Sequence, residues 1–192
     1  MLVIGFAGVI EVGKSEMAKG LHLSYPNTFR RSFAAHLKDC VKFMFRLTDW
    51  HVNTSEGKRT IIPALNITVR RALQLVGTDF ARNMIHKDFW VMHERSEIGK
   101  FHKDSIIIYD DVRFPNECNL IHDKKGIVIY LSRDFESTAT EEEKNHDSEN
   151  ILSEESITEY LHLPNNIKTA NEIVHETIIK FTGERDGKRV QR

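Results

Sequence analysis

The stretch Gly8-Val-Ile-Glu-Val-Gly-Lys-Ser15 decides the fold of this chain, because it fits the phosphate-binding loop pattern G-x-x-x-x-G-K-[ST]. The apolar run Leu2–Ala7 before it predicts a buried strand, and residues Ser15–Leu23 after it predict a helix. A loop in this position presents backbone N–H groups to an anion at the helix start, where the helix dipole favours negative charge. The sequence therefore predicts a phosphate site at the first strand–helix junction.

The loop residues have distinct expected parts. Glycines at both ends let the backbone curl so that its N–H groups point inward. Lys14 can reach the β- and γ-phosphates of a nucleotide, and the Ser15 hydroxyl can hold Mg²⁺. The residues expected to line the phosphate site are Gly8, Val9, Ile10, Glu11, Val12, Gly13, Lys14, Ser15 and Glu16.

Two of these residues are unusual in such a loop. Val12 is bulky where a small residue is common, and Glu11 adds negative charge beside the expected phosphates. Either could weaken phosphate binding, by steric cost or by like-charge repulsion. We expect both side chains to point outward, since only the backbone has to face the ligand.

Length and composition bound the remaining choices. The chain has 192 residues, 40% of them hydrophobic and 29% charged, with a formal net charge of −1. This length suits one domain with a sizeable core, and the balanced charge argues against nucleic acid as a partner. The two cysteines, Cys40 and Cys118, predict free buried thiols in a reducing compartment. No apolar run approaches the roughly 20 residues that cross a bilayer, so we expect a soluble cytoplasmic protein without a membrane partner.

Apolar, β-rich runs alternate with helical segments along the chain, which favours a three-layer α/β fold with a mainly parallel five-stranded sheet. The two runs around Ile107 and Val128 are continuously apolar, as in strands covered on both faces. The expected strands are 2–7, 28–33, 105–110, 126–131 and 167–170. The expected later helices are 34–47, 68–85, 89–100, 115–123 and 171–181.

We expect one domain over residues 1–183, with a helical, substrate-covering insertion at 48–104 and a basic tail at 184–192. The acidic, polar stretch Glu136–Asn150 is either a solvated surface loop or part of a mobile lid at 133–150. His146 within it is expected to be a structural contact and not a catalytic base.

Helical residues four apart share a face, which places Arg70, Gln74 and Asp79 near one helical edge. Guanidinium groups grip phosphate with two parallel bonds, and amide or carboxylate groups can read the edge of a base. A solvated helical face would carry the same residue types, so both readings stay open.

Two strands end in charged side chains. Asp110 and Asp111 close the third strand, where an aspartate can orient Mg²⁺, and Arg113 follows to form an ion pair or touch phosphate. A purely structural Asp–Arg pair is the alternative. Arg133 follows the fourth strand and could neutralise charge on a phosphate in transfer. Open α/β sheets place their ligands at such strand ends.

Several strings, in this order, resemble the phage-type deoxynucleoside monophosphate kinases, a P-loop nucleoside monophosphate kinase-like family. They are Ser32-Phe-Ala-Ala-His-Leu-Lys38, Arg70-x-Ala-Leu-Gln-x-x-Gly-Thr-Asp79-x-x-Arg82, His86-x-Asp-x-Trp-Val91, Asp111-Val-Arg-Phe-Pro-Asn-Glu117 and His146-x-Ser-Glu149. With the phosphate loop they span roughly residues 2–150. Ala35-His36 and Ala81 depart from the residues frequent in that family, and these departures bear on substrate placement.

The resemblance implies the P-loop NTPase fold and transfer of the γ-phosphate of ATP, with Mg²⁺, to a deoxynucleoside monophosphate (dNMP). It implies Lys14, Asp111 and Arg133 as catalytic residues, and Ser15 and Asp110 near the metal. The dNMP would be bound by Lys38, Arg70, Gln74, Asp79, Arg82, Trp90 and Arg113. The resemblance also hints at a homodimer.

Such an enzyme would feed DNA synthesis inside cells, for example in phage-infected bacteria. Two alternatives remain open on the sequence. The chain could be a P-loop kinase for another small acceptor, such as dephospho-coenzyme A. It could also be a non-catalytic nucleotide-binding module, with Glu11 and Val12 as signs of decay.

Overall fold

The computed structural model describes residues 1–136 and 152–186, which divide into two compact units. One unit comprises the described residues 1–30, 102–136 and 152–186, and the other comprises residues 31–101. No helix in the described part of the chain is both long and apolar enough to cross a membrane.

The first unit is built on a five-stranded sheet in the order β2-β5-β1-β6-β7. β1 pairs in parallel with both β5 and β6, and β6 pairs in parallel with β7. The strands are β1 (Leu2–Ala7), β2 (Thr28–Arg31), β5 (Ile106–Tyr109), β6 (Ile127–Ser132) and β7 (Glu159–His162). The helices are α1 (Lys14–Ser24), α7 (Pro115–Asp123), the short η3 (Glu154–Ser156) and α9 (Ile167–Asp186).

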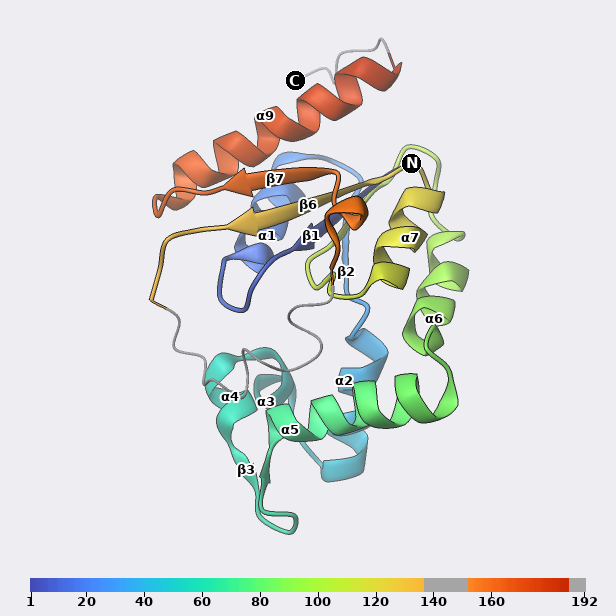
Figure 1. Ribbon diagram of the computed structural model, residues 1–192, viewed down its shortest axis with the longest axis vertical. Helices are drawn as coiled ribbons and strands as arrows, with labels where there is room; N and C mark the ends of the chain where they lie inside the picture. Colours follow the sequence, from blue (N-terminus) through green and yellow to red (C-terminus); the bar gives the residue numbers. More distant parts are fainter. Residues whose placement is uncertain (137–151, 187–192) are drawn as a thin grey trace. The chain divides into compact units, whose positions relative to one another are not determined.

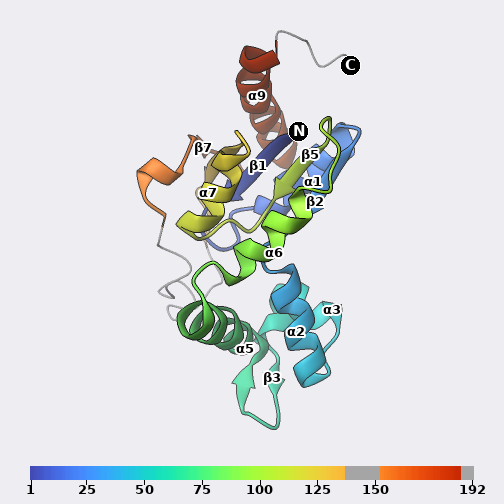
Figure 2. The same cartoon turned by 90° about the vertical axis from the view of Figure 1, so that its right-hand side faces the viewer.

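Alternation along β1 explains the layers on its two sides. Ile4 and Phe6 belong to a buried cluster with side chains of α1 and α9. Gly5 points the other way, where a Cβ would meet Ile121 of α7 at 2.5 Å. Helices thus cover both faces of the sheet, as can be followed in Figure 2. The predicted α/β fold, with a mostly parallel five-stranded sheet flanked by helices, is confirmed.

The fifth strand was placed wrongly by the sequence. Residues 167–170 form the first turn of α9, and the fifth strand is β7. Asn166 marks the helix start, because its side-chain Oδ1 accepts the backbone N–H of Thr169 at 3.1 Å. The other four predicted strands agree with the structure to within two residues, and α7 matches its predicted bounds.

The second unit is mainly helical and has a small apolar cluster of its own, made of Val41, Val52, Ile62, Val69 and Ala72. Its helices are α2 (Ala35–Phe45), α3 (Asp49–Asn53), α4 (Ser55–Arg59), α5 (Val69–Gln74), η1 (Leu75–Ile85) and α6 (Phe89–Ile98). A hairpin of β3 (Ile61–Ile62) and β4 (Ile67–Thr68) lies between α4 and α5.

The predicted helix 68–85 is continuous but changes its winding. Its first part is α5, and its second part, η1, is a π-helix that ends with the N–H of His86 on the carbonyl of Ala81 at 3.0 Å. Bonds from residue i to i+5 widen the turn, and π segments occur often at functional sites.

Candidate nucleotide site

The loop between β1 and α1 has the curled backbone that the motif predicts. Gly8 has a φ of 132° and Gly13 a φ of 104°, values that side chains disfavour. A Cβ on Gly8 would also lie 2.3 Å from the carbonyl oxygen of Leu131 in β6. Gly8 is therefore required both by its backbone conformation and by the close approach of a neighbouring strand.

The expectation for Val12 is wrong. Its side chain is completely buried and belongs to the core cluster that includes Phe6, Met17 and Leu131. The Glu11 side chain is exposed as expected, on a residue with a φ of 67°. The bulky valine thus packs under the loop and anchors it to the core, instead of projecting into solvent.

Lys14 is held over the loop. It begins α1 and is 9% exposed, and its ammonium Nζ donates to the carbonyls of Gly8 at 2.7 Å and Val9 at 2.8 Å. Ser15 follows in the first turn of α1 and is exposed. A buried ammonium and a free helix start together concentrate positive potential at the loop.

Arg133 lies beside this loop, directly after β6. A Cβ built on Gly13 would be 3.7 Å from both terminal nitrogens of its guanidinium. The Nε and one terminal nitrogen, Nη2, are buried and have no hydrogen-bond partner in the described part of the chain. Buried donors without acceptors are costly, and phosphate oxygens are the acceptors that a guanidinium fits best. The curled loop and these donors therefore fit a bound polyphosphate.

The end of β5 lies level with the end of β1. Gly5 and Tyr109 are register partners, and the N–H of Val112 donates to the carbonyl of Phe6 at 3.2 Å. Asp110 and Asp111 thus follow β5 where the phosphate loop begins. β1 and β5 are parallel neighbours, and the helices that follow them, α1 and α7, pack on opposite faces of the sheet, as at a topological switch point.

Asp110 forms an ion pair in this structure. Its Oδ2 accepts a hydrogen bond from Nη2 of Arg30 at 2.8 Å, and its side chain is 15% exposed. The ion pair fixes the carboxylate at the strand end where Mg²⁺ was predicted. The described residues contain no group of three or more His, Cys, Asp or Glu side chains arranged to hold a metal.

Glu117 is a buried residue to which the sequence assigned no role. Its Oε2 accepts the backbone N–H of Arg113 at 2.7 Å and that of Phe114 at 3.1 Å, and it is 2% exposed. These bonds cap α7 and fix the backbone that carries Asp111 and Arg113. The capping spacing, with glutamate three residues after Phe114, was the available signal.

The predicted acceptor-binding residues of the second unit lie on α5 and η1. Asp79 forms an ion pair with Arg71 at 3.7 Å. Arg82 is 9% exposed, and its Nη1 donates to the carbonyl of Lys87 at 3.2 Å. Because η1 is wound with five-residue bonds, the α-helical spacing used to place Arg70, Gln74 and Asp79 on one edge does not apply beyond Gln74.

Trp90 and Lys38 lie on the helices that pack with η1. The indole Nε1 of Trp90, on α6, donates to the carbonyl of Gly77 at 2.9 Å, and the ring is 4% exposed. A Cβ on Gly77 would lie 2.5 Å from Leu37 of α2, next to Lys38. Gly77 is thus in close contact with both helices. His146 and most of the proposed lid lie outside the described residues.

Comparison with known proteins identifies the family of the chain. Residues 25–171 match the family described as deoxynucleotide monophosphate kinase. A putative deoxynucleotide monophosphate kinase of Acanthamoeba polyphaga mimivirus is 30% identical over 145 residues, which are 69% of this chain and 75% of that protein. A deoxynucleoside-5'-monophosphate kinase of Escherichia phage T5 is 39% identical over 69 residues, or 36% of this chain and 27% of that protein.

Among solved structures, the Deinococcus radiodurans tunicamycin resistance protein matches with a TM-score of 0.46 and 12% identity, over 95% of each chain. The family match covers most of the present sequence and includes the ends of β5 and β6, α5 and η1. The resemblance found in the sequence is thereby confirmed: the chain belongs to the deoxynucleotide monophosphate kinase family.

Proposed function

We propose that this protein transfers the γ-phosphate of ATP to the phosphate of a dNMP, giving ADP and the deoxynucleoside diphosphate. The observation that carries the proposal is the loop cradle with Lys14 over it and the donor-rich Arg133 guanidinium beside it. Membership of the family supports the acceptor class.

In the proposed reaction, an oxygen of the acceptor phosphate attacks the γ-phosphorus, and the bond from that phosphorus to the β,γ-bridging oxygen breaks. The leaving oxygen stays with ADP, so no group other than the phosphoryl moves. The protein has little covalent chemistry to perform, because such transfers depend on positioning and charge neutralisation.

The charge would be neutralised from two sides of the loop. The Lys14 ammonium, which donates to the carbonyls of Gly8 and Val9, could turn toward phosphate oxygens at the same loop. Arg133 can offer its unused donors without breaking a bond within the described protein. Ser15 and Asp110 are the residues proposed to hold Mg²⁺, which would supply further neutralisation of the phosphate charge.

The acceptor is proposed to bind through the second unit, with Arg70 and Arg82 on its 5′-phosphate and Gln74 and Asp79 near its sugar or base. Lys38 and Arg113 are also proposed to contact the acceptor, and the buried Trp90 would support η1, which carries Asp79 and Arg82. Water exclusion during transfer is the role proposed for residues 133–150.

A coupled ADP-release assay against the four common dNMPs tests the proposal. We expect ADP to form with at least one dNMP, and Lys14→Ala to reduce the chemical step by orders of magnitude. ATP binding without ADP formation would instead indicate a non-catalytic module. Phosphorylation of dephospho-coenzyme A alone would indicate a kinase for another acceptor.

A further inference from the structure

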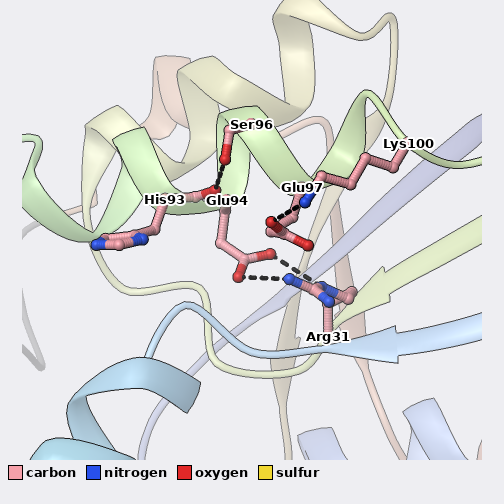
Figure 3. A network of polar contacts seen from close by, with 6 residues as sticks. All are labelled: Arg31, His93, Glu94, Ser96, Glu97 and Lys100. Atoms are coloured by element: carbon pink, nitrogen blue, oxygen red, sulfur yellow. Dashed lines mark hydrogen bonds and ion pairs between the residues drawn. The ribbon is translucent and has the colours of Figure 1, made fainter.

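A buried ion pair within the second unit joins Arg31, the first residue of that unit, to Glu94 in the middle of α6. Arg31 Nε donates to Glu94 Oε2 at 3.0 Å, and its Nη2 donates to Oε1 at 2.8 Å, so the two groups meet as parallel forks. The Glu94 side chain is 1% exposed and that of Arg31 24% exposed. Figure 3 shows the two forks facing each other below α6.

Stability alone is a weak reason for such a pair. Removing two charges from water is costly, and apolar side chains of similar volume often stabilise a protein as well or better. A forked pair gives something that apolar packing lacks, because its two parallel hydrogen bonds fix direction as well as distance. The pair therefore defines the rotation and the position of α6.

The position of α6 in turn determines where the Trp90 side chain lies. Trp90 precedes Glu94 by four residues, so the two side chains share a face of the helix. The indole of Trp90 donates to the carbonyl of Gly77, and Leu37 leaves no room for a side chain on that residue. A small rotation of α6 would move this hydrogen bond and with it the backbone of η1.

η1 is the element that needs such support. Its wide π turns have poorer packing and occur rarely, so they persist where surrounding contacts hold them. Gly77 lies between Gln74 and Asp79 along the chain, and Arg82 lies one π turn beyond Gly77. Gln74, Asp79 and Arg82, three of the residues proposed to bind the acceptor, thus flank the point where Trp90 holds the backbone.

We propose that Arg31 and Glu94 are positioning residues for acceptor binding, acting through Trp90 and Gly77 on η1. The proposal rests on the proposed function for its kinetic consequence, but its structural consequence can be measured without catalysis. Neither residue is a catalytic residue, because both act through α6.

Steady-state kinetics with full-length protein provide the first test. Glu94→Gln keeps the shape of the side chain and Arg31→Lys keeps its charge, but each variant loses the two parallel hydrogen bonds. Each should raise KM for the dNMP roughly tenfold or more, because the acceptor-binding residues are then held less accurately. KM for ATP should stay near the wild-type value. The matched control is Ser96→Ala on the same helix, which removes the exposed hydrogen bond from the Ser96 hydroxyl to the carbonyl of His93 and should change neither KM.

The double variant Arg31→Leu/Glu94→Leu separates positioning from stability. It should melt near the wild-type temperature, since leucines can replace the pair in a buried position, while KM for the dNMP stays raised. Should the single variants fail to fold, this variant decides the question. A double variant with wild-type KM for the dNMP would overturn the proposal.

Hydrogen exchange supplies a readout that does not depend on activity. Amides of η1 should exchange faster in the double variant than in the wild-type protein or Ser96→Ala, and amides of β1 should not change. If the wild-type protein phosphorylates no dNMP, the proposed function fails while this measurement still tests the inference. Unchanged exchange in η1 would overturn the inference itself.

Discussion

The guanidinium of Arg133 lies against the α-carbon of Gly13, close enough that a side chain there would be in van der Waals contact with it. The two residues come from different strand–loop junctions, and the adjacent strands β1 and β6 bring them together. The arginine donors thus lie beside the start of α1, where a phosphate would sit.

Arg133→Ala should lower kcat about a hundredfold or more, as expected when a donor to a transition-state oxyanion is lost. The melting temperature should barely change, because Nε and Nη2 have no partner among the described residues. Calorimetry and single-turnover kinetics on the same preparation measure both effects. Arg133→Lys keeps the charge but loses the planar guanidinium donors, so its kcat should lie between those of the wild-type protein and Arg133→Ala. A large loss of stability in Arg133→Ala would show that the residue is structural.

Two glycine substitutions in the phosphate loop distinguish the cost of a steric clash from the cost of an unfavourable φ angle. Gly8→Ala meets both a positive φ and the carbonyl of Leu131 at 2.3 Å, and should lower the free energy of unfolding by about 1–3 kcal/mol or more. Gly13→Ala meets only the φ, because its nearest neighbour would be 3.7 Å away, and should cost about 1–2 kcal/mol. Urea unfolding measures the difference. Equal losses in the two variants would contradict the steric role of Leu131.

The contact between α1 and α9 should make stability depend on pH. The Tyr25 and His175 rings stack at 5.1 Å, and the tyrosine hydroxyl and imidazole Nδ1 are 3.2 Å apart. Burial lowers the pKa of His175 below its usual 6.5 and raises the pKa of Tyr25 above its usual 10.0. The folded state thus favours both neutral forms.

For His175, the unfolded chain binds more protons than the folded one around pH 6.5, so stability should fall as the pH is lowered through that value. For Tyr25, stability should fall as the pH rises through 10. Melting temperatures from pH 5 to pH 8 test the first effect. His175→Phe keeps a ring against Tyr25 and should show a shallower slope than the wild type. An identical slope would exclude His175 as a cause.

The two cysteines should react very differently with a thiol reagent. Cys118 is completely buried on α7, and burial together with the nearby Glu117 raises its pKa to about 12. Cys40 is exposed on α2. Because the thiolate is the reactive form, the native protein should be labelled at Cys40 only, and the denatured protein at both. Mass spectrometry after labelling identifies the site, and rapid native labelling of Cys118 would contradict the burial.

The sequence predicted best where local chemistry and local structure coincide. The phosphate loop, the strand before it and the helix after it follow from one short motif. α7 matched its bounds because Pro115 suits a first helical turn. The exposed cysteine shows the limit of composition alone, since both thiols were expected to be buried.

Other features depend on partners far along the chain. Glu94 and Arg31 are 63 residues apart, and no local pattern marks a buried pair at that separation. The π-helix η1 contacts Trp90 and Leu37, which lie outside its own segment, and the sequence of that segment alone reads as an ordinary helix. In β7 every second residue faces solvent, so this strand has no continuous apolar run. The β-branched residues at the start of α9 looked more like a strand, and the fifth strand was predicted there instead.

The buried Val12 side chain affects the free energy of ligand binding. A flexible loop loses conformational freedom on binding, and that loss subtracts from affinity. Here the Val12 side chain packs with Phe6, Met17 and Leu131, and this packing holds the phosphate loop in its conformation before any anion binds. A polyphosphate should therefore meet a rigid receptor, and little of its binding free energy should be consumed in ordering the chain.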